Sequence, residues 1–171
     1  MIHQSGLTSL RDQEEGSERF QKLGVAQDLL GSGFLALPAA DAEVELVKRA
    51  LPIIQERIVK LDEAPALLKF LFVKNFAVDP EAVSKISDAG AKDILKRSLK
   101  DLENLSTWNH DSIEAALRAS LIEELGLKPR IAFTALRIAT TGSTISPPLF
   151  ESMELLGKEA CLARITGAIS L

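Results

Sequence analysis

The stretch KPRIAFTALRIATTG occupies residues 128–142, followed by SPPLF at 146–150 and LLGK at 155–158. These residues predict a short apolar element that carries Arg137, a break at Gly142, and a helix that restarts at Ser146. Such a break exposes backbone N–H groups and a hydroxyl beside a fixed guanidinium. Groups of this kind can contact a polar, planar, partly anionic ligand such as an unstacked RNA base. The spacing alone does not identify RNA as the ligand.

Apolar residues recur at intervals of three and four over most of the chain, as in amphipathic helices. Asp79 is expected to be an acidic cap before Pro80 at the start of a helix, and Asp88 is expected to begin the next helix. Asp111 is expected to be an N-cap, and Pro52 is expected to kink or split the helix that contains it. Sustained two-residue alternation is absent, so we expect an all-α protein of two packed helical subdomains. The predicted helices cover residues 17–33, 41–61, 63–73, 88–105, 111–126, 146–157 and 158–169.

The same pattern suggests how the chain is divided. Residues 1–40 form a weakly patterned N-terminal helical edge, and residues 41–105 form a first helical subdomain. Residues 106–171 form a second subdomain, which contains the break at Gly142. We expect the boundary between the two subdomains near residues 106–110.

Charge is unevenly distributed along a chain whose net charge is −4. Residues 101–127 contain six acids and one arginine, a net charge of −5, whereas residues 128–171 contain five bases and three acids, a net charge of +2. The positive charge therefore gathers around the break, and any RNA contact should be local rather than a wrap.

Single residues also limit the possible settings. One cysteine, Cys161, excludes an intramolecular disulfide, and its apolar neighbours favour a buried small hydrophobe over a reactive thiol. The longest weakly charged run, 29–40, is far shorter than the ~20 residues of a membrane span. We expect a cytoplasmic monomer that does not contact membranes.

The sequence offers little for catalysis. His3 and His110 are isolated, and we expect His110 to be a solvated turn residue before a helix. Clusters with metal-ligand spacing and phosphate-binding glycine loops are absent from the sequence. We therefore expect no catalytic residues, no metal site and no cofactor in this chain, although an enzyme with an unrecognised site stays open.

The stretches quoted above resemble the C-terminal anticodon-binding region of bacterial glutamate–tRNA ligases, which are class I aminoacyl-tRNA synthetases, and most closely those of actinobacteria. A second block agrees with the family upstream, in ALPIIQER at 50–57, EAP at 63–65 and FLF at 70–72. The resemblance covers about residues 43–171 and implies a helical bundle that binds the anticodon loop of glutamate tRNA. The family's catalytic half carries a His-x-Gly-His element and a Lys-Met-Ser-Lys-Ser loop, and neither string occurs here.

The resemblance therefore implies that this chain is only the tRNA-reading part, whether a cloned fragment or a separate piece, and that it is inactive alone. The intact ligase would attach glutamate to its tRNA in translation, using ATP and magnesium. The expected partners are the tRNA and the catalytic half of the same enzyme.

Carried over residue by residue, Arg137 matches the family arginine that hydrogen-bonds a base edge. Ser146, Pro147 and Leu149 match positions that line the base pockets, next to Gly142 of the Thr-Gly pair. Arg57 or a near neighbour in the upstream block is expected to face the first anticodon base. The family often has a basic residue after Thr-Gly, where this chain has Ser143-Thr144. One phosphate or base contact of the family is therefore expected to be absent here or supplied by another residue.

Structural roles compete with these assignments. Arg137 could instead bridge helices, and Lys128, Arg130 and Lys158 are as readily solvated charges as phosphate contacts. Phe133 and Phe150 are expected in the core rather than as stacking platforms. The competing function is a helical protein-interaction adaptor that docks partners through residues 67–73 and does not bind RNA.

Overall fold

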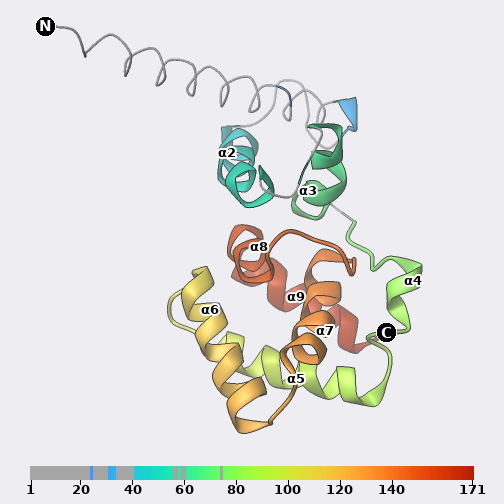
Figure 1. Cartoon of the computed structure of the whole chain (residues 1–171), viewed down its shortest axis with the longest axis vertical. Coiled ribbons are helices and arrows are strands. Elements are labelled where there is room, and N and C mark those ends of the chain that lie inside the picture. The colour runs from blue at the N-terminus through green and yellow to red at the C-terminus, as the bar shows by residue number, and fades with distance from the viewer. Residues whose placement is uncertain (1–23, 25–30, 34–40, 56–57, 59–60, 74) are drawn as a thin grey trace, which may run out of the picture. The chain divides into compact units, whose positions relative to one another are not determined.

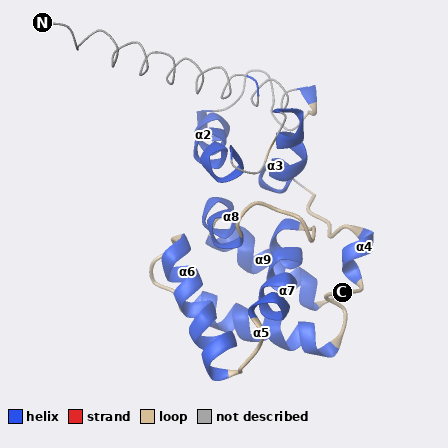
Figure 2. Ribbon diagram, viewed as in Figure 1, coloured by secondary structure: helices blue, strands red, loops and turns tan. Residues whose placement is uncertain are grey.

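The computed structural model describes residues 24, 31–33, 41–55, 58, 61–73 and 75–171. Throughout these residues the secondary structure is helical, and none of them lies in a strand (Figure 2). The all-α prediction is confirmed. Most of the helix expected at 17–33 lies outside the described residues. The helices are α2 (Asp41–Gln55), η1 (Leu61–Glu63), α3 (Ala64–Phe72), α4 (Pro80–Val83), α5 (Ala89–Glu103), α6 (His110–Leu117), η2 (Arg118–Glu124), α7 (Pro129–Thr141), α8 (Leu149–Leu156) and α9 (Lys158–Ile169).

The chain divides into two compact units, Met1–Lys69 and Phe70–Leu171. In the first unit, the buried residues of α2 are Val47, Ala50, Leu51 and Ile54, which recur at helical spacing. Pro52 lies inside α2 and is exposed, and the helix continues through it to Gln55 rather than splitting there. The tRNA-reading roles predicted for residues 41–105 and 106–171, and the boundary predicted between them near residues 106–110, stay predictions.

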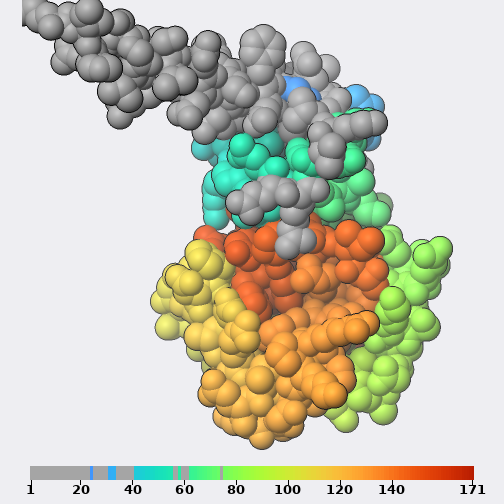
Figure 3. Space-filling view, in the orientation of Figure 1, coloured from blue at the N-terminus to red at the C-terminus, as the bar shows by residue number. Residues whose placement is uncertain are grey.

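The second unit is built around α5, which contacts α6, η2, α7 and α9 (Figure 1). Its amphipathic face buries Ile94, Leu95 and Leu102 against the other helices. η2 also contacts α7, and the surfaces of these two segments adjoin on the face seen in Figure 3. Burial of large aliphatic side chains stabilises the unit by about 1.5–3 kcal/mol for each one. The fully buried large side chains of this core are Ile86, Leu95, Leu102, Ile113, Leu117, Leu121, Leu136, Ile138 and Met153.

Helix ends follow local signals in most places. The helix predicted to begin at Asp88 is present as α5, and the Asp88 side chain is its N-cap, accepting a hydrogen bond of 2.9 Å from the backbone N–H of Ala91. The predicted N-cap at Asp111 is wrong. The N-cap is Asn109, two residues earlier, whose side chain accepts a 2.8 Å bond from the N–H of Ser112, so α6 begins at His110 and Asp111 lies in its first turn.

The segment that follows α6 is a π-helix, η2, and it continues the same helical course. Ser120 within it has a buried hydroxyl. The whole segment ends before Gly126, whose φ of +64° lies in the left-handed region. The helix predicted at 111–126 is therefore α6 plus η2.

Candidate nucleic-acid interface

Gly142 ends α7 in a conformation that favours glycine. Its φ is +82°, and its N–H donates a 2.9 Å hydrogen bond to the carbonyl of Ile138. A Cβ at this position would lie 2.9 Å from the carbonyl oxygen of Ala77 and 3.3 Å from the Phe76 ring. The carbonyl of Gly142 also accepts a 2.8 Å bond from the N–H of Asp79. The break predicted at Gly142 is present, and it also packs the 76–79 segment against the end of α7.

Arg137 connects α7 to the segment that precedes α8. Its Nη1 donates a 2.6 Å hydrogen bond to Ser146 Oγ and a 2.9 Å bond to the carbonyl of Pro147. The hydroxyl of Ser146 in turn donates a 2.9 Å bond to the same Pro147 carbonyl. The half-buried guanidinium therefore holds the Ser146–Pro147 turn in place.

The prediction that Ser146 caps the following helix is wrong. Helix α8 begins at Leu149 with Pro148 as its N-cap, and Ser146 lies three residues before it. A hydroxyl engaged by a guanidinium is not available to a distant backbone N–H, and charge-assisted bonds are the stronger ones. Ser146, Pro147 and Leu149 are all buried, and Leu149 belongs to the core of the second unit.

Lys128 and Arg130 lie at the other end of α7 and are exposed. Both line a groove of 910 Å³ between α5 and α7, together with Lys85. Arg137 is seven residues beyond Arg130 on a helix that rises 1.5 Å per residue, so the two lie about 10 Å apart along the axis. The structure thus separates Lys128 and Arg130, at the N-terminal end of α7, from Arg137, near its C-terminal end.

Lys158, at the start of α9, has a defined partner. Its Nζ donates hydrogen bonds of 2.9 Å and 2.8 Å to the carbonyls of Glu103 and Leu105. These carbonyls lie at the C-terminal end of α5, where a positive charge is favoured. Arg57, the remaining predicted site residue, lies outside the described residues.

Arg164, which the sequence patterns did not single out, binds groups at the C-terminal end of α7. Its Nη1 donates a 2.6 Å bond to the carbonyl of Thr140, and its Nη2 donates a 2.8 Å bond to that of Phe70. Its guanidinium stacks over the Phe76 ring at 4.0 Å. Burial lowers the pKa of this half-buried group. The three partners lie 24 to 94 positions away in sequence, so the only early signal was a basic residue within an apolar helix.

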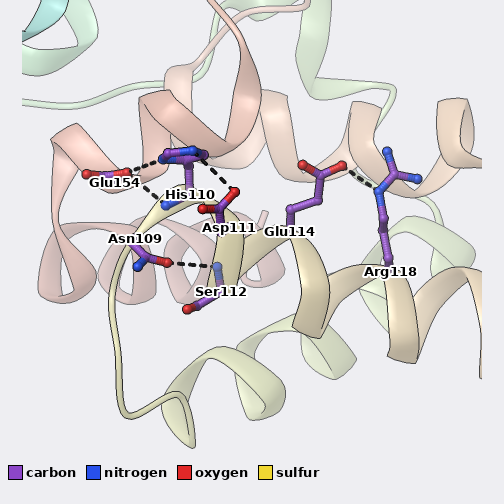
Figure 4. A network of polar contacts seen from close by, with 7 residues as sticks. All are labelled: Asn109, His110, Asp111, Ser112, Glu114, Arg118 and Glu154. Carbon is purple, nitrogen blue, oxygen red and sulfur yellow. Dashed lines mark hydrogen bonds and ion pairs between the residues drawn. The ribbon is translucent and has the colours of Figure 1, made fainter.

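His110 takes part in a polar network that joins α6 to α8 (Figure 4). Its Nδ1 and its backbone N–H both lie 2.8 Å from Glu154 Oε2, and its Nε2 lies 3.3 Å from Asp111. The hydrogen bond to Glu154 raises the pKa of His110 above its usual value. The sequence predicted a solvated turn residue, whereas His110 is the first residue of α6 and is exposed but paired.

Aromatic and sulfur groups lie where the sequence predicted. Phe133 and Phe150 pack edge-to-face at 5.2 Å, partly buried against the core, with Arg118 over the Phe133 ring. Cys161 is fully buried, and desolvation raises its pKa to about 12. Within the described part of the chain, no group of His, Cys, Asp and Glu side chains could hold a metal ion. No helix in that part is both long enough and apolar enough to cross a membrane.

A family model described as an anticodon binding domain matches residues 23–169. The chain belongs to this family of anticodon-binding domains. Similar proteins confirm the resemblance that was predicted from the sequence. This chain is 44% identical over 139 residues to the glutamate–tRNA ligase of Acidothermus cellulolyticus, and the match covers 80% of this chain and 28% of that protein. It is 49% identical over 121 residues to that of Rhodococcus jostii, covering 70% and 25%.

The chain therefore spans about a quarter of the length of the curated relatives that it matches. Among solved structures, a glutamate tRNA ligase from Elizabethkingia meningosepticum in complex with its amino acid superposes with a TM-score of 0.70 at 19% identity. That match covers 89% of this chain and 29% of the other. It shows that this anticodon-binding domain shares a helical fold with a segment of a full-length ligase.

Proposed function

We propose that this chain binds the anticodon loop of glutamate tRNA and contributes base discrimination to a glutamate–tRNA ligase. The observation that carries the proposal is the match of an anticodon-binding family over residues 23–169, which includes most of both units. The relatives are named glutamate–tRNA ligases, which makes glutamate tRNA the ligand to test first.

Within this proposal, Arg137 contacts the edge of one anticodon base, and the Ser146–Pro147 turn and Leu149 line the base pockets. The hydrogen bonds of Arg137 to Ser146 Oγ and to the Pro147 carbonyl bring these three residues together at one place, which is what the proposal needs. Ser146 and Leu149 are buried in the chain alone. Contact with a base therefore requires the segment between α7 and α8 to shift, and a base that reaches Ser146 Oγ replaces part of the Arg137 bond.

Phosphate contacts are assigned to the exposed pair Lys128 and Arg130, and a further contact to Arg57. For Lys158 we propose two roles, a structural one, in which its ammonium binds the carbonyls of Glu103 and Leu105, and a contribution to the positive charge that attracts RNA. A lysine engaged in this way adds positive potential for RNA without a large rearrangement.

We propose that the intact ligase attaches glutamate to its tRNA with ATP and magnesium in the cytoplasm, and that this chain supplies tRNA reading and no catalytic group. The tRNA and the ligase's catalytic half are then its partners, and the chain itself is a monomer. Neither signature string of the catalytic half occurs in these 171 residues.

The experiment is a mobility-shift titration of the 171-residue chain with glutamate tRNA and with the same tRNA carrying an altered anticodon. The proposal predicts tighter binding of the matched tRNA. Equal binding of both, or none, favours the adaptor alternative. In the segment proposed for adaptor docking, Leu68 and Phe70 are buried, whereas the other apolar residues, Leu67, Leu71, Phe72 and Val73, are partly exposed.

A further inference from the structure

Ile145 is the most exposed large apolar residue in the described part of the chain. Its relative exposure is 77%, compared with 55% for Ile131 and 49% for Leu125. It lies in the segment between Gly142 and Pro148 that joins α7 to α8. A β-branched apolar side chain is unusual at the tip of such a connection, where small polar residues prevail.

Ser146, one residue after Ile145, and Ser143, two residues before it, both make hydrogen bonds. The next residue, Ser146, accepts the 2.6 Å hydrogen bond from Arg137 Nη1. The backbone N–H of Ile145 lies 3.4 Å from Ser143 Oγ, and the carbonyl of Ser143 lies 3.3 Å from Thr141 Oγ1. Ile145 is therefore presented to solvent beside the turn that Arg137 holds.

Single exposed apolar residues are common on protein surfaces, so exposure alone is not evidence of binding. Position distinguishes Ile145 from Ile131. Ile131 lies in the groove at the N-terminal end of α7, whereas Ile145 is adjacent in sequence to the turn that Arg137 holds. At that turn the chain combines a cation, a hydroxyl and backbone groups with one uncovered apolar side chain.

We propose that Ile145 covers the flat face of one unstacked nucleobase in the anticodon loop, beside the base edges that the Arg137–Ser146 turn contacts. This inference rests on the proposed function and adds a residue to it. A base that leaves its stack exposes an apolar face to water, and contact with an apolar or aromatic side chain restores part of the lost stacking. Every base has such a face, so Ile145 contributes affinity with little base preference, and the neighbouring polar groups supply the preference.

The test compares three variants of the full 171-residue chain by fluorescence anisotropy with a glutamate tRNA anticodon stem-loop. Ile145→Ala should raise Kd by about fivefold, because it removes three carbons from an apolar contact that is covered on one side. Ile145→Phe should keep or improve the affinity, because an aromatic ring stacks on a base. Leu171→Ala is the control, because Leu171 is an apolar residue of the same unit with 55% exposure that does not line the groove of Lys128 and Arg130, and it should leave Kd unchanged.

A series of stem-loops with an abasic nucleotide at each anticodon position identifies the contact. The difference between wild-type chain and Ile145→Ala should vanish at one position and persist at the others. Tight binding of the wild-type chain with unchanged Kd for Ile145→Ala would overturn the inference and leave the proposed function standing. Failure of the wild-type chain to bind any stem-loop would overturn both. An equal loss in Leu171→Ala would also overturn the inference, because the effect would not depend on the turn.

Discussion

Gly142→Ala tests how the end of α7 is built. A non-glycine residue in the left-handed region costs about 1–2 kcal/mol, and the alanine recovers about 0.4–1 kcal/mol by restricting the unfolded chain. The new Cβ would also lie 2.9 Å from the Ala77 carbonyl oxygen, which is backbone and cannot move aside easily. Overpacking of this kind costs about 1–3 kcal/mol, so the total loss of unfolding free energy should be about 3 kcal/mol.

Gly126→Ala is the matched control, because Gly126 has a φ of +64° and a Cβ there would meet nothing within 4 Å. It should cost about 1 kcal/mol, from backbone conformation alone. Urea unfolding followed by circular dichroism gives both values, provided that the m-values agree. Equal destabilisation by the two substitutions would refute the reasoning, because it would show that the contact with the 76–79 segment contributes nothing.

Three further outcomes follow from the polar and buried groups. The hydrogen bond to Glu154 raises the pKa of His110 in the folded state, so this pair should stabilise the fold fully below about pH 6.5, the ordinary histidine pKa. This stabilisation should disappear as pH rises through the folded-state pKa of His110. Melting temperatures between pH 5 and 9 should show the loss, and His110→Gln should make them less dependent on pH. Lys158→Ala removes the hydrogen bonds to two carbonyls at the end of α5 and should lower the free energy of unfolding by about 1–2 kcal/mol. It should weaken the binding of matched tRNA and of tRNA with an altered anticodon by the same factor, and a selective loss of matched binding would contradict a role for Lys158 that does not depend on the anticodon. Cys161, with a pKa of about 12, should not react with a thiol reagent at pH 8 until the chain unfolds in denaturant, and rapid labelling of the native chain would contradict its burial.

The parts of the fold that depend on local sequence could be predicted. Asp88 caps α5, Gly142 ends α7 and Gly157 ends α8, because each signal acts within one turn of the helix that it bounds. The apolar spacing likewise predicted an all-helical chain.

The prediction failed where a contact distant in sequence competes with a local one. Ser146 has the residue type of an N-cap, but its hydroxyl is engaged by Arg137, nine positions earlier. Arg164 could not be recognised as an organising residue, because its partners include Phe70 and Phe76, which only the folded chain brings to it. Lys158 was considered only as a solvated or phosphate-binding charge, although the end of α5 lies next to it in space.

The central claim is that this chain distinguishes anticodons through the turn that Arg137 holds. The direct measurement is the Kd of wild-type chain and of Arg137→Ala for a glutamate tRNA anticodon stem-loop and for one with an altered anticodon, with melting temperatures recorded alongside. If Arg137 contacts a base edge, its loss should weaken matched binding by about 1–3 kcal/mol and reduce the preference for the matched anticodon. A variant that melts like wild type and keeps its full preference would contradict the claim, as would a loss of affinity no larger than the loss of folded protein.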